Sequence, residues 1–186
     1  MSSTLPDFLR ETQAAVRSQM RDGALYEELV FSGIVMDHMS EIGMTFEPVE
    51  CHFEGKVGNA NLRLSGYALS EEADQLDLFV SLYANVDEPT RIPDSETEAA
   101  AKQCLRFLAQ CAEGKMAALL DPTSDARSLA ETLHAIYNEL EQIRIYVITD
   151  RVAKSKSFKT KDVAGKAVRL EVMDIERLHR HISEGK

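Results

Sequence analysis

Several common features are missing from this sequence. Tryptophan is absent from its 186 residues, and there are only three cysteines and five prolines. Cys51, Cys104 and Cys111 make an odd set with no CxxC pair, which gives no disulfide framework and suits a reducing compartment. No apolar run approaches the ~18–20 residues that a membrane span needs, and the first residues lack a secretory signal. We therefore expect a soluble, cytoplasmic protein that has no membrane partner.

Positive charge is also scarce. The sequence has 21 Lys and Arg residues against 31 Asp and Glu residues, and its formal net charge is -10. A nucleic-acid footprint over the whole surface is therefore excluded, and any such contact must be local. The apolar fraction of 44% and the charged fraction of 28% are typical of globular chains. The length fits one core, so we expect residues 1–186 to form a single domain.

Signatures of common enzyme classes are missing as well. The sequence contains no nucleophile elbow, no phosphate-binding glycine loop and no HExxH motif. Its five histidines are scattered, and adjacent residues such as Cys51 and His52 point to opposite faces of a strand. A structural zinc needs about four convergent ligands. The residues by themselves therefore predict no metal site and no cofactor.

The hydrophobic pattern does predict an alternation of helices and strands. Thr4 and Asp174 are suitable N-caps, and Leu25 falls on the apolar side of the second helix. Helical periods cover residues 4–21, 24–42, 95–120, the segment from the break at 121–124 to about 142, and 174–182. Strand patterns cover residues 49–54, 59–70, 76–83, 144–150 and 168–172. This order predicts an α/β (α+β) fold with an antiparallel three-strand meander in one mixed sheet, covered by helices.

One short segment departs from the acidic composition. Residues 151–166 contain six basic residues and the single acid Asp162. Such a segment could bind nucleic acid if its lysines contact phosphates and its aromatic ring stacks on a base. Those residues would be Lys154, Lys156, Phe158, Lys159 and Lys161. The alternative, which we favour, is a mobile connection between two strands, because Ser and Lys are typical of disordered loops.

Four stretches of the sequence carry a family resemblance. They are CHFEG at 51–55, LSGYALSEEADQLDLFVSLY at 64–83, RIYVITD at 144–150 and EVMDIERLHRHISEGK at 171–186. In this order the chain resembles the N-terminal domain of the abortive-infection phage-resistance (AIPR) family of bacterial proteins. The resemblance implies a role in phage defence. It also implies a longer protein whose C-terminal region would be a partner of this domain.

The same domain is similar to the restriction-endonuclease-like fold, where an Asp on one strand and an acid-x-Lys on the next assemble a Mg²⁺ site. The Asp position corresponds to Ser65, and the acid-x-Lys position begins at Ser81 and ends at Tyr83. All three positions depart from a working nuclease, so we expect a non-catalytic nuclease-like scaffold that binds a partner or nucleic acid. The alternative is a Mg²⁺-dependent nuclease that uses Glu28 and Asp77.

Overall fold

The computed structural model describes residues 4–24 and 26–184, and Leu25 lies outside the described residues. Six α-helices, one 3₁₀-helix and eight strands follow the order ααβββ-β-ααα-η-ββββ-α in the described chain. The helices are α1 (Leu5–Arg21), α2 (Glu27–Glu41), α3 (Asp94–Ala112), α4 (Met116–Leu119), α5 (Asp125–Ile136), η1 (Tyr137–Glu139) and α6 (Ile175–Glu184). The strands are β1 (Pro48–Val57), β2 (Ala60–Leu69), β3 (Gln75–Leu82), β4 (Arg91–Ile92), β5 (Gln142–Thr149), β6 (Val152–Ala153), β7 (Ser157–Val163) and β8 (Lys166–Asp174).

One mixed sheet organises the described chain. Its strand order is β1-β2-β3-β5-β8-β7, and a separate parallel pair joins β4 to β6. The first three strands form the expected antiparallel meander. β3, β5 and β8 are mutually parallel, and β7 returns antiparallel to β8. The predicted mixed α/β sheet is therefore confirmed.

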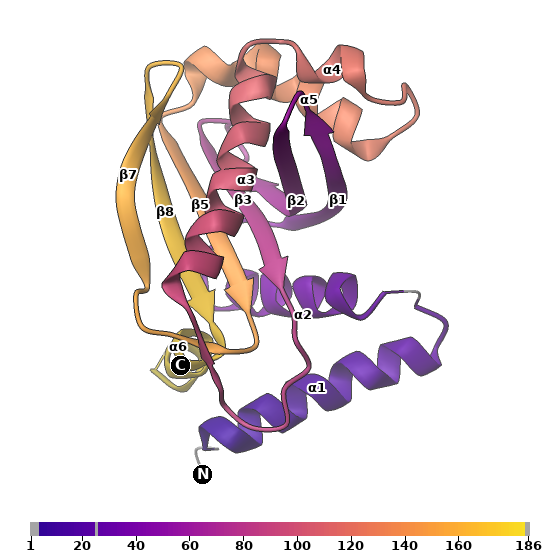
Figure 1. The fold of residues 1–186 in the computed structure, drawn as a ribbon, viewed down its shortest axis with the longest axis vertical. Helices are drawn as coiled ribbons and strands as arrows, with labels where there is room; N and C mark the ends of the chain where they lie inside the picture. Colours follow the sequence, from indigo (N-terminus) through magenta and orange to yellow (C-terminus); the bar gives the residue numbers. More distant parts are fainter. Residues whose placement is uncertain (1–3, 25, 185–186) are drawn as a thin grey trace.

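Helices cover both faces of the sheet (Figure 1). The first core packs α3 and α5 against side chains such as Leu64, Leu78 and Val80. The second core packs α1, α2 and α6 against the opposite face, which presents Phe79 and Tyr146. In Figure 1, α3 crosses the front of the sheet, and the α1–α2 pair lies across its lower part. The sheet is therefore the middle layer of a three-layer arrangement.

Several helix ends follow the signals in the sequence. The backbone N–H of Asp7 donates to the Thr4 hydroxyl at 3.2 Å, which confirms Thr4 as the N-cap of α1. The backbone N–H of Arg177 donates to the Asp174 carboxylate at 2.8 Å, so Asp174 caps α6 as expected. Past the end of α2, Gly43 has φ +79°, a conformation that glycine adopts without strain. Local chemistry thus determined these boundaries.

The predicted long helix over 95–120 is wrong in two respects. Gly114, with φ +78°, ends α3 and separates it from the short α4. The start of the helix also differs: α3 begins at Asp94, and its N-cap residue, Pro93, has no side chain that can accept a hydrogen bond. The Asp94 carboxylate instead accepts hydrogen bonds from the backbone N–H and hydroxyl of Ser155, at 3.3 and 2.6 Å.

The register of β3 agrees with its alternating pattern. Leu78 and Val80 lie in the α3-side core, whereas Asp77 contacts Thr45 and Arg144, and Ser81 contacts Ser32 of α2. Asp77 and Leu78 therefore lie on opposite faces of the sheet, as the period-two alternation of a strand requires. The β1–β2 pair is less regular, since a register shift in β1 falls between Glu50 and Phe53, opposite residue 65.

The expected mobile loop at 151–166 is wrong, because the segment folds into β6 and β7. β7 pairs with β8 through a hairpin whose two turn residues, Ala164 and Gly165, have φ +48° and +83°. Two successive positive φ angles are the geometry of a type I′ turn, which suits the twist of the flanking strands.

Within the described residues, no helix has the length and apolarity to cross a bilayer.

Candidate functional site

The positions that would form a nuclease centre lie where β2, β3 and α2 meet. Ser65 and Ser81 are 1% and 0% exposed, and Ser32 of α2 is also fully buried. The Ser32 and Ser81 hydroxyls share a hydrogen bond, and the Ser32 hydroxyl donates to the Glu28 carbonyl at 2.8 Å. The Ser65 hydroxyl accepts the backbone N–H of Ser81 at 3.0 Å. The Ser32 and Ser81 hydroxyls therefore bond to each other, and the Ser65 hydroxyl bonds to the backbone, all at buried positions.

Tyr83 stands at the position that would hold the lysine of an acid-x-Lys motif. Its ring stacks on Phe31 of α2, with 4.7 Å between the ring centroids. Its hydroxyl donates to the Asn85 side chain at 3.1 Å. Burial, assisted by the nearby Asp150 and Glu27, raises the pKa of Tyr83 to about 12. The tyrosine therefore stays neutral at physiological pH, whereas a lysine would carry a positive charge.

Asp77 is engaged in a buried ion pair. Its carboxylate accepts two hydrogen bonds from Arg144, at 2.7 and 2.8 Å, and a third from Thr45 at 2.6 Å. Its side chain is 1% exposed. Burial raises the pKa of Asp77, although the hydrogen bonds from Arg144 and Thr45 act in the opposite direction. The carboxylate is thus already supplied with donors and sits away from solvent.

Glu28, the other acid of the alternative site, has a partner of its own. Its carboxylate lies 2.6 Å from the Arg63 guanidinium, and both side chains are partly exposed. Glu28 and Asp77 are therefore each paired with a different arginine. Over residues 4–24 and 26–184, the structure places no group of three or more His, Cys, Asp or Glu side chains to hold a metal ion.

The cysteines do not supply a reactive thiol. All three are free and buried. Burial raises the pKa of the Cys51 thiol to about 11 and that of Cys111 to about 12. Because the thiolate is the nucleophilic form, these side chains act as apolar core residues.

Half of the basic side chains in 151–166 are held by the fold. Lys156 pairs with the buried Asp174, and its ammonium also lies 2.8 Å from Glu176. Lys166 donates to two backbone carbonyls at the end of η1, at 3.0 and 2.9 Å. Arg151 pairs with a glutamate of α3 at 3.2 Å. These three cations therefore stabilise the hairpin and its neighbours.

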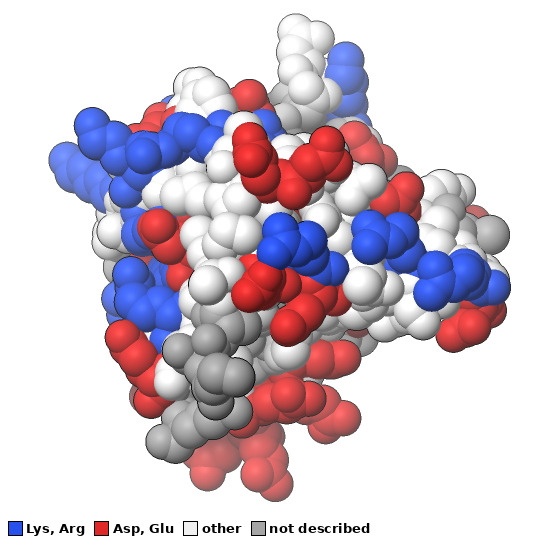
Figure 2. Space-filling view, turned by 90° about the horizontal axis from the view of Figure 1, so that it is seen from below, with Lys and Arg blue, Asp and Glu red and all other residues white. Residues whose placement is uncertain are grey.

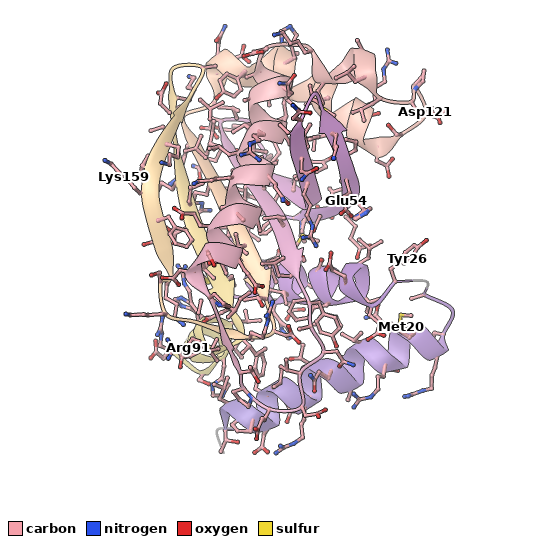
Figure 3. The ribbon with its side chains drawn as sticks, viewed as in Figure 1. Met20, Tyr26, Glu54, Arg91, Asp121 and Lys159 are labelled. Carbon is pink, nitrogen blue, oxygen red and sulfur yellow. The ribbon has the colours of Figure 1, made fainter. Side chains whose placement is uncertain are left out.

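Of the remaining lysines, Lys159 and Lys161 lie on β7, the outer strand of the sheet, and Lys154 lies in the link between β6 and β7. Lys154 and Lys159 are exposed, and Lys161 is half-buried. No ion pair reaches these three within the described part of the chain. Phe158, which we expected to be available for stacking, packs against the α3-side core. The labelled Lys159 projects outward from β7 in Figure 3.

Charge is unevenly distributed at the end of the molecule that carries α1 and α6. Figure 2 shows basic side chains at the left, the β7 side in Figure 1, with others across the middle and right, and acidic side chains along the lower margin. The net charge of -10 therefore does not describe every part of the surface.

Sequence reasoning missed one buried carboxylate. Asp150 follows β5, is fully buried and accepts the backbone N–H groups of Ala84, Asn85 and Val86 at 2.9, 2.8 and 3.3 Å. These hydrogen bonds fix the backbone of residues 84–86, which follow β3. An aspartate directly after an apolar strand was the available signal, but its partners lie more than sixty residues away.

A family model matches this arrangement of elements over residues 31–180, well over half of the chain. Its description is "Abortive infection phage resistance protein N-terminal domain". The chain belongs to this family. The match begins inside α2 and ends inside α6, so the AIPR N-terminal domain includes the whole sheet and the buried serine cluster. No curated protein and no solved structure matches the chain.

Proposed function

We propose that this AIPR N-terminal domain is a non-catalytic scaffold of a phage-defence protein. One observation supports the proposal: Ser65 and Ser81, at positions where the resemblance implies metal-binding acids, are buried serines, the Ser81 hydroxyl bonding to Ser32 and the Ser65 hydroxyl to the Ser81 backbone. Mg²⁺ requires near-octahedral oxygen ligands and keeps several of its waters, so it needs charged acceptors and a wet cavity. A buried cluster of neutral hydroxyls provides no charged acceptor and is closed to bulk solvent.

The enzyme alternative requires Glu28 and Asp77 to leave their arginines and act together. Each would have to exchange a short ion pair for a metal ligand, and the half-buried Arg144 would then lose its carboxylate partner. Loss of one partner from a buried pair costs about 3–5 kcal/mol. This cost is the physical reason for preferring the scaffold.

Titration calorimetry with millimolar Mg²⁺ and Mn²⁺ tests the proposal, together with cleavage assays on duplex DNA, single-stranded DNA and RNA. We expect no binding heat and no cleavage. Asp77→Asn serves as the comparison variant, since it keeps the shape of the side chain. Metal-dependent cleavage by the wild type that this change abolishes would refute the scaffold and restore Asp77 as a ligand.

We further propose that the scaffold works alongside the C-terminal region of the longer protein and contacts nucleic acid weakly through β7. Lys154, Lys159 and Lys161 support this second role because no ion pair reaches them within the described residues. Each phosphate contact contributes about -0.9 to the slope of log K against log salt. Three contacts therefore give a slope no steeper than about -2.7. Affinity should lie in the non-specific range, at about 10⁻⁴ to 10⁻⁵ M.

Fluorescence anisotropy with a labelled duplex and a labelled single strand, each at two salt concentrations, tests the nucleic-acid contact. Changing these three lysines to Ser should remove binding. The matched control changes Lys56, Lys102 and Lys115 to Ser. These three lysines are exposed on other parts of the surface, and their replacement alters the net charge by the same amount. Equal loss of binding in both variants would show that only overall charge matters, and β7 would then have no binding role.

A further inference from the structure

Two hollows follow one another between α2 and the edge strand β1. The first has a volume of about 560 Å³ and is lined by α2 residues and by Pro48, Val49 and Glu50. The second, of about 470 Å³, lies between the start of α2 and the next part of β1, where His52 and Glu54 line it. Because β1 ends the strand order, no other described strand covers this edge. We call the two hollows together the α2–β1 groove.

Exposed apolar side chains are concentrated along the α2–β1 groove. Only three large hydrophobic side chains of the described residues are exposed, and two of them, Tyr26 and Val49, line the groove. Tyr26 is 65% exposed and Val49 is 41% exposed. Figure 3 shows Tyr26 and Glu54 projecting on the same side of the molecule, one from the start of α2 and one from β1. Apolar groups rimmed by polar ones are typical of interaction sites.

The charge of the groove has one sign. Asp37, Glu50 and Glu54 line it, and no Lys or Arg is among its described lining residues. No ion pair reaches these three acids within residues 4–24 and 26–184, whereas Glu28 at the same groove is neutralised by Arg63. Acidic side chains therefore outnumber basic ones at the groove, beside exposed apolar surface, although Arg63 lies opposite Glu54 in the β1–β2 register.

We propose that the α2–β1 groove binds a basic, partly apolar segment of a partner polypeptide. Lys or Arg side chains of that segment pair with Glu50 and Glu54, and its apolar side chains pack on Tyr26 and Val49. The two glutamates are four residues apart on β1, roughly 13 Å at ~3.3 Å per residue, so an extended segment can match both. The same charge repels nucleic acid, and this proposal is independent of the β7 contact.

A labelled twelve-residue peptide of alternating Lys and Val is the probe, measured by fluorescence anisotropy at low and physiological salt. Glu50→Gln/Glu54→Gln should weaken binding about tenfold and flatten its salt dependence. The matched control is Glu71→Gln/Glu72→Gln in the exposed β2–β3 turn, which changes the net charge equally and should leave affinity unchanged. Equal weakening in both variants would overturn the proposal, because attraction to overall charge would then explain the binding.

The apolar contacts are tested separately. Tyr26→Ser/Val49→Thr should weaken binding about tenfold, while Leu119→Ser, at the third exposed apolar position, should not. Thermal unfolding of all variants serves as the control for folding. Because the substituted side chains are exposed, the unfolding temperatures should stay close to that of the wild type. Light scattering on the unliganded domain identifies another occupant: self-association that Glu50→Gln/Glu54→Gln removes would assign the groove to a second copy and refute a separate partner.

Discussion

The buried pair of Asp77 and Arg144 provides a quantitative test of the structure. Asp77→Ala removes three acceptor contacts and leaves Arg144, which is 18% exposed, without its carboxylate. Breaking a buried pair from one side costs about 3–5 kcal/mol of unfolding free energy. Removing both partners in Asp77→Ala/Arg144→Met should cost far less than the two single losses together, because no unpaired charge remains.

The pH dependence of Arg144→Met gives a second observable. Burial already raises the pKa of Asp77, and loss of Arg144 removes the main interaction that lowers it. The folded protein then retains a proton that the unfolded chain, with a carboxyl pKa of about 3.9, releases. The retained proton therefore makes its full contribution to the free energy of unfolding below that value. This contribution falls as the pH rises toward the folded pKa, by at most about 1.4 kcal/mol per pH unit.

Urea unfolding of the four proteins, at pH values from 4 to 8, measures both effects through the midpoint and slope of each transition. The expected result is a strongly non-additive cycle and a stability of Arg144→Met that declines with pH relative to the wild type. Additive losses, together with a pH-independent difference, would show that Asp77 and Arg144 are not coupled in the folded protein.

Three further substitutions test two packed positions and one ion pair. Urea unfolding measures the change in unfolding free energy for each. Leu78→Ala should cost about 2–5 kcal/mol because Leu78 is fully buried, and a loss well under about 1 kcal/mol would contradict its place in the core. Gly66→Ala should cost about 1–3 kcal/mol, since the new Cβ would lie 2.7 Å from the Met36 sulfur and 2.9 Å from a backbone carbonyl; an unchanged midpoint would refute that close approach. Lys156→Met should cost about 1–3 kcal/mol because it leaves the buried Asp174 without its cation, whereas the control Lys159→Met should stay within about 0.5 kcal/mol. Equal effects of the two lysine changes would rule out a structural role for Lys156.

Sequence reasoning succeeded where neighbouring residues decide the structure. The Thr4 cap and the Asp174 cap each depend on a hydrogen bond that spans three residues. The alternation of β3 likewise follows from period two, which placed Leu78 and Asp77 on opposite faces. Such local signals were sufficient for the order of most elements.

The missed features depend on residues that are distant in sequence. Lys and Ser make 151–166 resemble a loop, but pairing with β8 and the ion pair of Lys156 with Asp174 order it. The arginine partners of the two candidate acids could not be predicted, because Arg144 reaches Asp77 across 67 positions of sequence. Nor does the pattern reveal the α2–β1 groove, which exists only after the helix and the edge strand have packed.

The two outer strands of the sheet share an irregularity that affects association between molecules. In β1 the register shifts between Glu50 and Phe53, and in β7 it shifts between Phe158 and Lys161. A bulge twists a strand and interrupts its ladder of backbone groups, and charged side chains such as Lys159 add repulsion between like edges. Neither edge is therefore a long, flat template for amyloid-like stacking, so the domain resists edge-to-edge aggregation.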